Sequence, residues 1–153
     1  MLRWLWLSAA VIGLDLGTKR LAETALSPYE PLKLTSFFDL TLMYNTGAAF
    51  SFLSDQDGWQ RWFFVVVAVL VTLVLGGWLA TLKTGERLAA AALSLIIGGA
   101  LGNLVDRVLY GHVTDFIHLH YQQWYWPAFN IADSAITVGV VLILLARRPD
   151  SAA

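Results

Sequence analysis

The sequence predicts an all-α integral membrane protein with four transmembrane helices and a small extracytoplasmic β-element between the first and second helices. Hydrophobic residues make up 58% of the chain and charged residues only 14%, against roughly 45–50% and about 25% in ordinary globular proteins. Four apolar stretches have about the length that a helix needs to cross a bilayer. The segments between them are short, so we expect a single membrane domain over residues 1–153.

The four expected spans cover residues 4–25, 60–82, 88–108 and 131–147. The clearest apolar run, from Trp62 to Leu82, contains no charge. Asp15 and Lys19 interrupt the first span; they are four residues apart, so both lie on one helix face and can form an ion pair. Arg3 and the apolar run after it also resemble a cleavable secretion signal. The charges that follow at once, without a small-residue cleavage site, favour a retained helix.

Basic residues in the connecting segments predict the orientation of the chain. They lie between the second and third spans and after the fourth: Lys83, Arg87, Arg147 and Arg148. Because positively charged loops stay in the cytoplasm, we expect both termini there and residues 27–58 and 109–130 outside. The net charge of −1 argues against a nucleic-acid partner, which would need a basic surface.

One segment of the outer region has the pattern of a β-strand. Phe37–Tyr44 is rich in β-forming residues and partly alternates between apolar and polar. Asn45 and Gly47 follow, and both residue types tolerate positive φ. We therefore expect a short strand and a turn on the outer membrane surface.

Two aspartates are the candidates for catalysis. The third span runs outward and the fourth runs inward, so the connection between them brings Asp115 and Asp133 to the same membrane depth. Two nearby carboxylates cannot both ionise cheaply, so one keeps its proton and the pair can act on water as base and acid, as in an aspartyl protease. A structural role stays open, because a membrane carboxylate can also pair with a cation, face solvent or cap a helix, and Asp133 lies near a helix start.

Further polar residues lie near the outer end of the third span. Arg107 could neutralise Asp106 or Asp15, which we favour, or hold the carbonyl groups of a bound peptide. Asn103 lies one helical turn earlier. Small residues spaced four apart from Gly98 to Gly102 predict a close approach of helices rather than cofactor binding.

Three other interpretations compete with catalysis. His118 and His120 with Asp115 suggest a metal site, but the sequence indicates no third ligand of the kind a zinc site shows. A small membrane transporter or ion-relay subunit could use the charged residues, but it predicts paired broken helices in repeated halves, which the sequence lacks. A non-enzymatic membrane assembly factor with structural carboxylates stays open.

Taken together, the motifs resemble the prolipoprotein signal peptidase family, also called signal peptidase II. The resemblance covers nearly the whole chain, in family order and at family spacing: Asp15-Leu-Gly-Thr-Lys19, Asn45-Thr-Gly-Ala-Ala-Phe50, Gly98-Gly-Ala-Leu-Gly-Asn-Leu-Val-Asp-Arg107, Val113-Thr-Asp-Phe116 and Phe129-Asn-Ile-Ala-Asp-Ser134. It implies an aspartyl endopeptidase of the bacterial cytoplasmic membrane whose active site lies at the extracytoplasmic interface. The implied substrates are diacylglyceryl-modified prolipoproteins, cut just before the lipid-carrying cysteine.

The resemblance also implies roles for individual residues. The catalytic aspartates fall on Asp115 and Asp133, and the supporting residues on Asp15, Lys19, Asn45, Gly47, Asn103, Asp106, Arg107 and Asn130. A flexible lid would lie near residues 45–52. The implied chemistry needs no metal or organic cofactor, membrane lipids are the other partners, and a monomer suffices. We expect Asp133 to be the base and Asp115 to start protonated.

Overall fold

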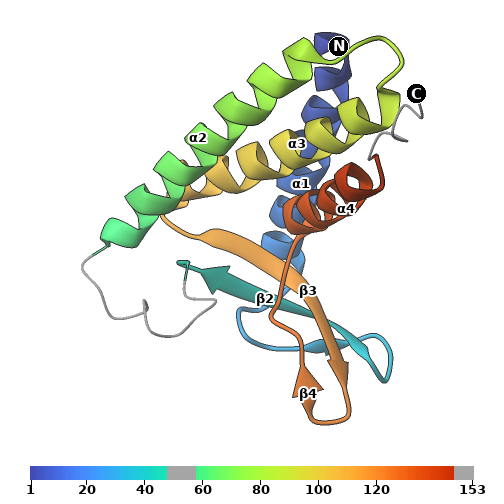
Figure 1. Cartoon of the computed structure of the whole chain (residues 1–153). Coiled ribbons are helices and arrows are strands. Elements are labelled where there is room, and N and C mark those ends of the chain that lie inside the picture. The colour runs from blue at the N-terminus through green and yellow to red at the C-terminus, as the bar shows by residue number, and fades with distance from the viewer. Residues whose placement is uncertain (48–57, 147–153) are drawn as a thin grey trace.

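The computed structural model describes residues 1–47 and 58–146. A short 3-10 helix, η1 (Leu2–Trp4), leads into four α-helices: α1 (Leu5–Ala25), α2 (Trp59–Thr81), α3 (Arg87–Tyr110) and α4 (Ile131–Leu145). The helices gather on one side of a small sheet, and α1 begins and α4 ends at the end of the bundle far from that sheet (Figure 1). Each of the four apolar stretches therefore forms a helix.

α3 is the centre of the helical layer. It packs against α1, α2 and α4. In its most apolar stretch of 18 residues 61% is buried, whereas the corresponding stretch of α2 is 6% buried. Glycines permit this packing because they have no side chain. A Cβ at Gly98 would overlap the Ser8 backbone of α1, and one at Gly99 would overlap the Ala132 carbonyl oxygen of α4. The close helix approach predicted from the small residues is confirmed.

Two of the helices, α2 and α3, are long and apolar enough to cross a membrane. α4 is also apolar but has 15 residues, and α1 carries four charged residues in its second half. α2 exposes large apolar side chains along its length, among them Val66, Leu70, Leu73 and Val74. An exposed apolar surface of this extent marks a contact with lipid or with another apolar partner.

The sheet has four antiparallel strands in chain order: β1 (Leu32–Lys33), β2 (Phe38–Asn45), β3 (Val113–Tyr121) and β4 (Trp124–Tyr125). The strand predicted at Phe37–Tyr44 is β2. β1 and β2 come from the segment between α1 and α2, where we expect a β-element, and the sheet is completed by β3 and β4 from the segment between α3 and α4. Strand pairing joins segments far apart in the chain, and the pattern within one segment does not identify its partner.

β3 leads directly from the end of α3 to the region where sheet and helices meet. α3 ends at Gly111, whose φ of +81° lets the chain turn out of the helix. Within β3, Phe116 packs with Leu42 of β2 and Ala22 of α1. This small core holds the neighbouring Asp115 at the junction of sheet and helices.

Candidate active site

The first turn of α4 contains Asp133 in a capping box. Asn130 is the N-cap: its side-chain Oδ1 accepts a hydrogen bond from the Asp133 backbone N–H at 2.9 Å, and Asp133 Oδ2 accepts one from the Asn130 backbone N–H at 3.3 Å. The Asn130 Nδ2 group also donates to Asp115 Oδ1 at 2.7 Å. One buried amide side chain therefore contacts both aspartates, and Asp133 is a helix-capping residue as well as a member of the pair.

The remaining oxygen of each carboxylate also accepts a hydrogen bond from a neutral amide. Asn45 Nδ2 donates to Asp115 Oδ2 at 3.1 Å, and Asn103 Nδ2 donates to Asp133 Oδ1 at 2.8 Å. Asp115 is 2% exposed, whereas Asp133 is half-buried. Neutral donors orient both carboxylates without neutralising them.

The pKa of Asp115 is raised from its ordinary value of 3.8 to about 7. Burial is the largest cause, and the charge of Asp133 adds to it. The hydrogen bonds from Asn45 and Asn130, and the charge of Lys19, act in the opposite direction. A carboxyl group with this pKa holds a proton for much of the time at neutral pH.

A second group of acidic residues lies next to the pair and is fully buried. Lys19 Nζ lies 2.7 Å from Asp15 Oδ2 and 2.9 Å from Asp106 Oδ2. The predicted Asp15–Lys19 ion pair is confirmed. The expectation that Arg107 neutralises Asp106 or Asp15 is wrong, because the ammonium group of Lys19 makes contact with both carboxylates.

This buried group is also bonded to the backbone next to each aspartate of the pair. Asp15 Oδ1 accepts from the Ala132 N–H at 2.9 Å, and Asp106 Oδ2 accepts from the Thr114 N–H at 3.1 Å. Those two N–H groups belong to the residues directly before Asp133 and Asp115. Lys19 contacts both Asp15 and Asp106, and its Nζ also donates to Asn103 Oδ1 at 3.0 Å.

Arg107 lies in the electrostatic field of the pair, since the charges of Asp133 and Asp115 both act on it. Its guanidinium carbon lies 5.1 Å from the centre of the Phe64 ring, and Nη1 donates to the Asn103 carbonyl at 3.3 Å. Sequence reasoning missed Phe64, because nothing in its spacing distinguishes it from the other aromatic and aliphatic residues of α2. Only its contacts do.

Phe64 also packs against the turn that follows β2. Gly47 has a φ of +105°, and its N–H donates to Asn45 Oδ1 at 2.8 Å, so the predicted turn is confirmed. A Cβ at Gly47 would overlap the Phe64 ring. Glycine is therefore required by both the backbone and the contact. Most of the expected lid near residues 45–52 lies outside the described residues.

The histidines of β3 are separated from the acid pair. Because side chains alternate along a strand, Asp115 lies on one face and His118 and His120 on the other. His120 Nε2 lies 3.2 Å from Asp39 Oδ2, and both histidine rings contact Tyr125. Within residues 1–47 and 58–146, the structure contains no group of three or more acidic or histidine side chains placed to hold a metal ion.

Two adjacent carboxylates, one of them buried with a raised pKa, form the kind of acid pair that aspartic peptidases use. The family model for signal peptidase (SPase) II matches residues 7–147. The chain is 53% identical over 146 residues to a lipoprotein signal peptidase of Pseudomonas paraeruginosa, which covers 94% of this chain and 86% of the relative. It is 51% identical over 143 residues to that of Cellvibrio japonicus, covering 92% and 84%.

A solved structure agrees with these relatives. A bacterial membrane enzyme determined by the in meso method at 1.9 Å resolution superposes with a TM-score of 0.85 at 31% identity, covering 99% of this chain and 96% of that one. The chain therefore belongs to the signal peptidase II family, and it is a membrane protein with helices and a small antiparallel sheet.

Proposed function

We propose that the protein is an aspartic endopeptidase that removes the signal peptide from diacylglyceryl-modified prolipoproteins, with Asp115 and Asp133 as its catalytic pair. The family assignment supports the substrate class. The observation that supports the residues is that Asn130 donates to both carboxylates, from its side-chain Nδ2 to Asp115 Oδ1 and from its backbone N–H to Asp133 Oδ2, together with the pKa of about 7 at Asp115. The scissile bond is the one just before the lipid-carrying cysteine.

In the proposed mechanism, Asp133 is the base and Asp115 the acid. The dipole at the N-terminus of α4 favours a negative charge at Asp133, and this carboxylate deprotonates a water molecule as that water attacks the peptide carbonyl. Protonated Asp115 donates a hydrogen bond to the carbonyl oxygen and stabilises the charge that develops there. No metal or organic cofactor takes part in these steps.

The other residues predicted for the site act around this pair. Asn103 and Asn130 orient the carboxylates, and Asn45 with Gly47 forms the turn that closes over Asp115. Arg107 supplies positive charge beside the pair. The buried group of Asp15, Lys19 and Asp106 fixes the backbone next to both aspartates.

We further propose that all four helices cross the bacterial cytoplasmic membrane, with both termini in the cytoplasm and the acid pair at the extracytoplasmic surface. Lys83 lies in the turn between α2 and α3, Arg87 begins α3, and Arg3 lines the same pocket as Arg87. The N-terminus and this turn lie at the end of the bundle opposite the sheet (Figure 1). Positive residues of this kind stay in the cytoplasm. All the site residues come from one chain, so a monomer suffices.

Cleavage of a lipid-modified precursor by the purified protein in detergent tests this function. Asp115→Asn and Asp133→Asn should each abolish turnover while the protein stays folded, and a chelator should leave the rate unchanged. Asp39→Asn is the matched control, since Asp39 is a buried aspartate of the same sheet that contacts His120 rather than the acid pair, and it should keep turnover. Near-normal cleavage by either pair variant would refute the catalytic assignment. A folded wild-type protein without cleavage would favour a transporter subunit or an assembly factor.

A further inference from the structure

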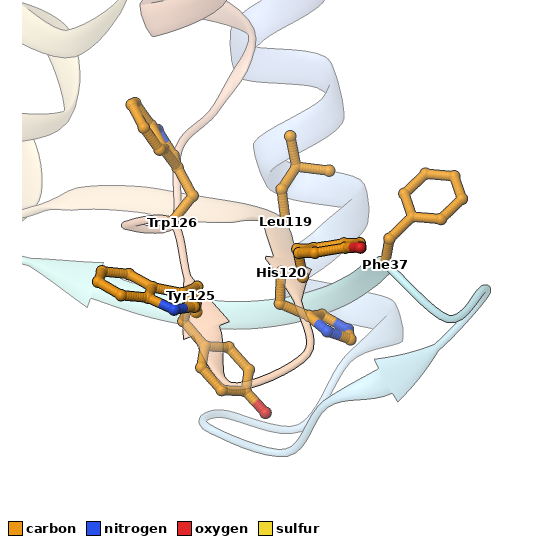
Figure 2. Close-up of a pocket in the computed structure, with 7 residues that line it drawn as sticks. Phe37, Leu119, His120, Tyr125 and Trp126 are labelled. Carbon is orange, nitrogen blue, oxygen red and sulfur yellow. The ribbon is translucent and has the colours of Figure 1, made fainter.

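Two pockets lined by aromatic side chains lie at opposite ends of the molecule, and they differ in charge. The pocket on the sheet has a volume of about 550 Å³, and its walls include His120 and Tyr125 (Figure 2). The described residues of those walls include no lysine or arginine. The pocket at the other end has about 380 Å³, and we name it the arginine pocket. It is lined by Arg3, Trp4, Trp6 and Arg87.

The fold brings the two arginines together from segments that are distant in the chain. Arg3 lies in η1, which contacts α2 and α3, and Arg87 is the first residue of α3. Trp4 packs against the buried cluster that includes Leu79 of α2 and Leu93 of α3. η1 is therefore held against the other helices, at the end of the bundle where the α2–α3 turn also lies (Figure 1).

The positive charge of the arginine pocket is not compensated by the protein around it. Within residues 1–47 and 58–146, neither Arg3 nor Arg87 forms an ion pair. The acidic residue beside Arg87 is Glu86, which accepts a hydrogen bond from the Lys83 backbone N–H at 2.8 Å. Two guanidinium groups on one pocket repel each other. A phosphate group bound there removes this repulsion and accepts charge-assisted hydrogen bonds from the planar arginine side chains.

The surroundings of the pocket fit a phosphate that carries acyl chains. Leu2, Leu5 and Trp6 are exposed beside the two arginines. Such side chains contact hydrocarbon in a membrane protein, and tryptophan rings favour the boundary between hydrocarbon and water. A soluble anion makes no use of these apolar groups. A phospholipid uses both parts of the surface, with its phosphate at the arginines and its acyl chains along η1 and α1.

We infer that the arginine pocket binds the phosphate group of an anionic phospholipid of the surrounding bilayer. A net negative lipid is favoured over a zwitterionic one, because the pocket presents two positive charges. The inference goes beyond the proposed function, since this lipid is a component of the membrane and not the substrate. In the proposed topology it belongs to the cytoplasmic leaflet, at the end of the bundle opposite the acid pair.

Native mass spectrometry of the protein in detergent tests this inference by resolving each bound lipid. The ligands are dioleoyl phosphatidylglycerol, which is anionic, dioleoyl phosphatidylcholine, whose choline balances the phosphate charge, and inorganic phosphate. Wild type should bind one phosphatidylglycerol molecule about tenfold or more tightly than phosphatidylcholine. Arg3→Gln and Arg87→Gln should each weaken phosphatidylglycerol binding about fivefold.

Lys83→Gln is the matched control. Lys83 is an exposed basic residue at the same end of the bundle, but it does not line the pocket, so the variant should keep the wild-type affinity. A loss in Lys83→Gln as large as in the arginine variants would overturn the inference in favour of diffuse attraction to a basic surface. All three variants replace exposed side chains, and melting temperatures equal to that of wild type check that they fold.

Two further outcomes also overturn the inference. Equal affinity of wild type for the two lipids would show that the charge of the headgroup is not recognised. Displacement of phosphatidylglycerol by an equal concentration of inorganic phosphate would assign the pocket to a soluble anion. Cleavage of a precursor is not a readout of this experiment, so its failure leaves the proposed function untouched, and an inactive protein would leave the lipid measurement intact.

Discussion

Two groups of aspartates lie side by side in this protein, and they are held in different ways. Asp15 and Asp106 are buried and both contact the ammonium group of Lys19, at 2.7 and 2.9 Å. Asp115 and Asp133 accept hydrogen bonds from neutral amides, and the part of the chain that the structure describes places no cation within ion-pair distance of either. The first group is therefore held by contact with a shared cation, whereas the second is held by neutral hydrogen-bond donors, and burial raises the pKa of Asp115 to about 7.

The difference separates structural from chemical roles for one residue type. A buried carboxylate in contact with a lysine has its charge compensated, and removing the lysine would leave that carboxylate unpaired in a poor solvent. A buried carboxylate held only by amides can take up a proton at moderate cost. Acid–base catalysis at neutral pH needs a carboxyl group held by amides, as in the pair of Asp115 and Asp133. The ion-paired group of Asp15, Lys19 and Asp106 keeps that pair in place.

The largest expected effect comes from removing the shared cation. Lys19→Met keeps the length of the side chain but leaves Asp15 and Asp106 buried without a partner. The free energy of unfolding in detergent should fall by about 3–5 kcal/mol, and cleavage should fall with it. The control Arg20→Met removes an exposed charge of the same helix and should change stability by less than about 0.5 kcal/mol. Equal stability of the two variants would contradict the comparison.

The second effect is the pH dependence of the pair. Above about pH 7 Asp115 loses its proton, so cleavage should fall about tenfold per pH unit on the alkaline side. The folded protein holds a proton on Asp115 between about pH 4 and 7 that the unfolded chain releases, so the free energy of unfolding should fall as pH rises through this range.

Denaturation at several pH values checks the sign of this effect. Asp115→Asn should remove the part of the decline that belongs to this residue. A stability curve for Asp115→Asn with the same slope as wild type would show that another group is responsible.

A smaller effect concerns the amide that stabilises the anion of Asp115. The hydrogen bond from Asn45 lowers the pKa of Asp115, so Asn45→Ala should raise that pKa and move the alkaline limb of the rate profile to higher pH. Thr46→Ala changes an exposed neighbour in the same turn and should leave the limb in place. A limb that moves to lower pH in Asn45→Ala would refute the assigned role of the hydrogen bond.

The smallest effect concerns the position of the Arg107 guanidinium beside the pair. Phe64→Leu removes the ring below Arg107 and should lower kcat/KM about fivefold, the equivalent of ~1 kcal/mol for a partly buried cation–π contact. Phe64→Tyr keeps a ring and should retain activity. Phe63→Leu alters an adjacent residue that is 50% exposed and should have no effect; a loss as large as that of Phe64→Leu would argue against the contact.

Local patterns in the sequence were enough for much of this description. The length of the apolar stretches predicts the four helices, because a helix buries its own backbone polar groups whatever its neighbours are. The four-residue spacing of Asp15 and Lys19 predicts their pairing, and Asn45 with Gly47 predicts the turn. Each of these inferences depends on residues that are close along the chain.

Short-range patterns in the chain therefore specify the set of helices, the turn and the acidic residues available for chemistry. Packing in three dimensions establishes the rest: Lys19 rather than Arg107 is in contact with Asp106, β3 and β4 complete the sheet, and Phe64 lies below Arg107. The physical reason is that a cation neutralises whichever carboxylate it can reach, and a strand pairs with whichever edge is presented to it. The carboxylate that a cation can reach and the strand edge that is available for pairing both depend on packing between segments that are distant in the chain.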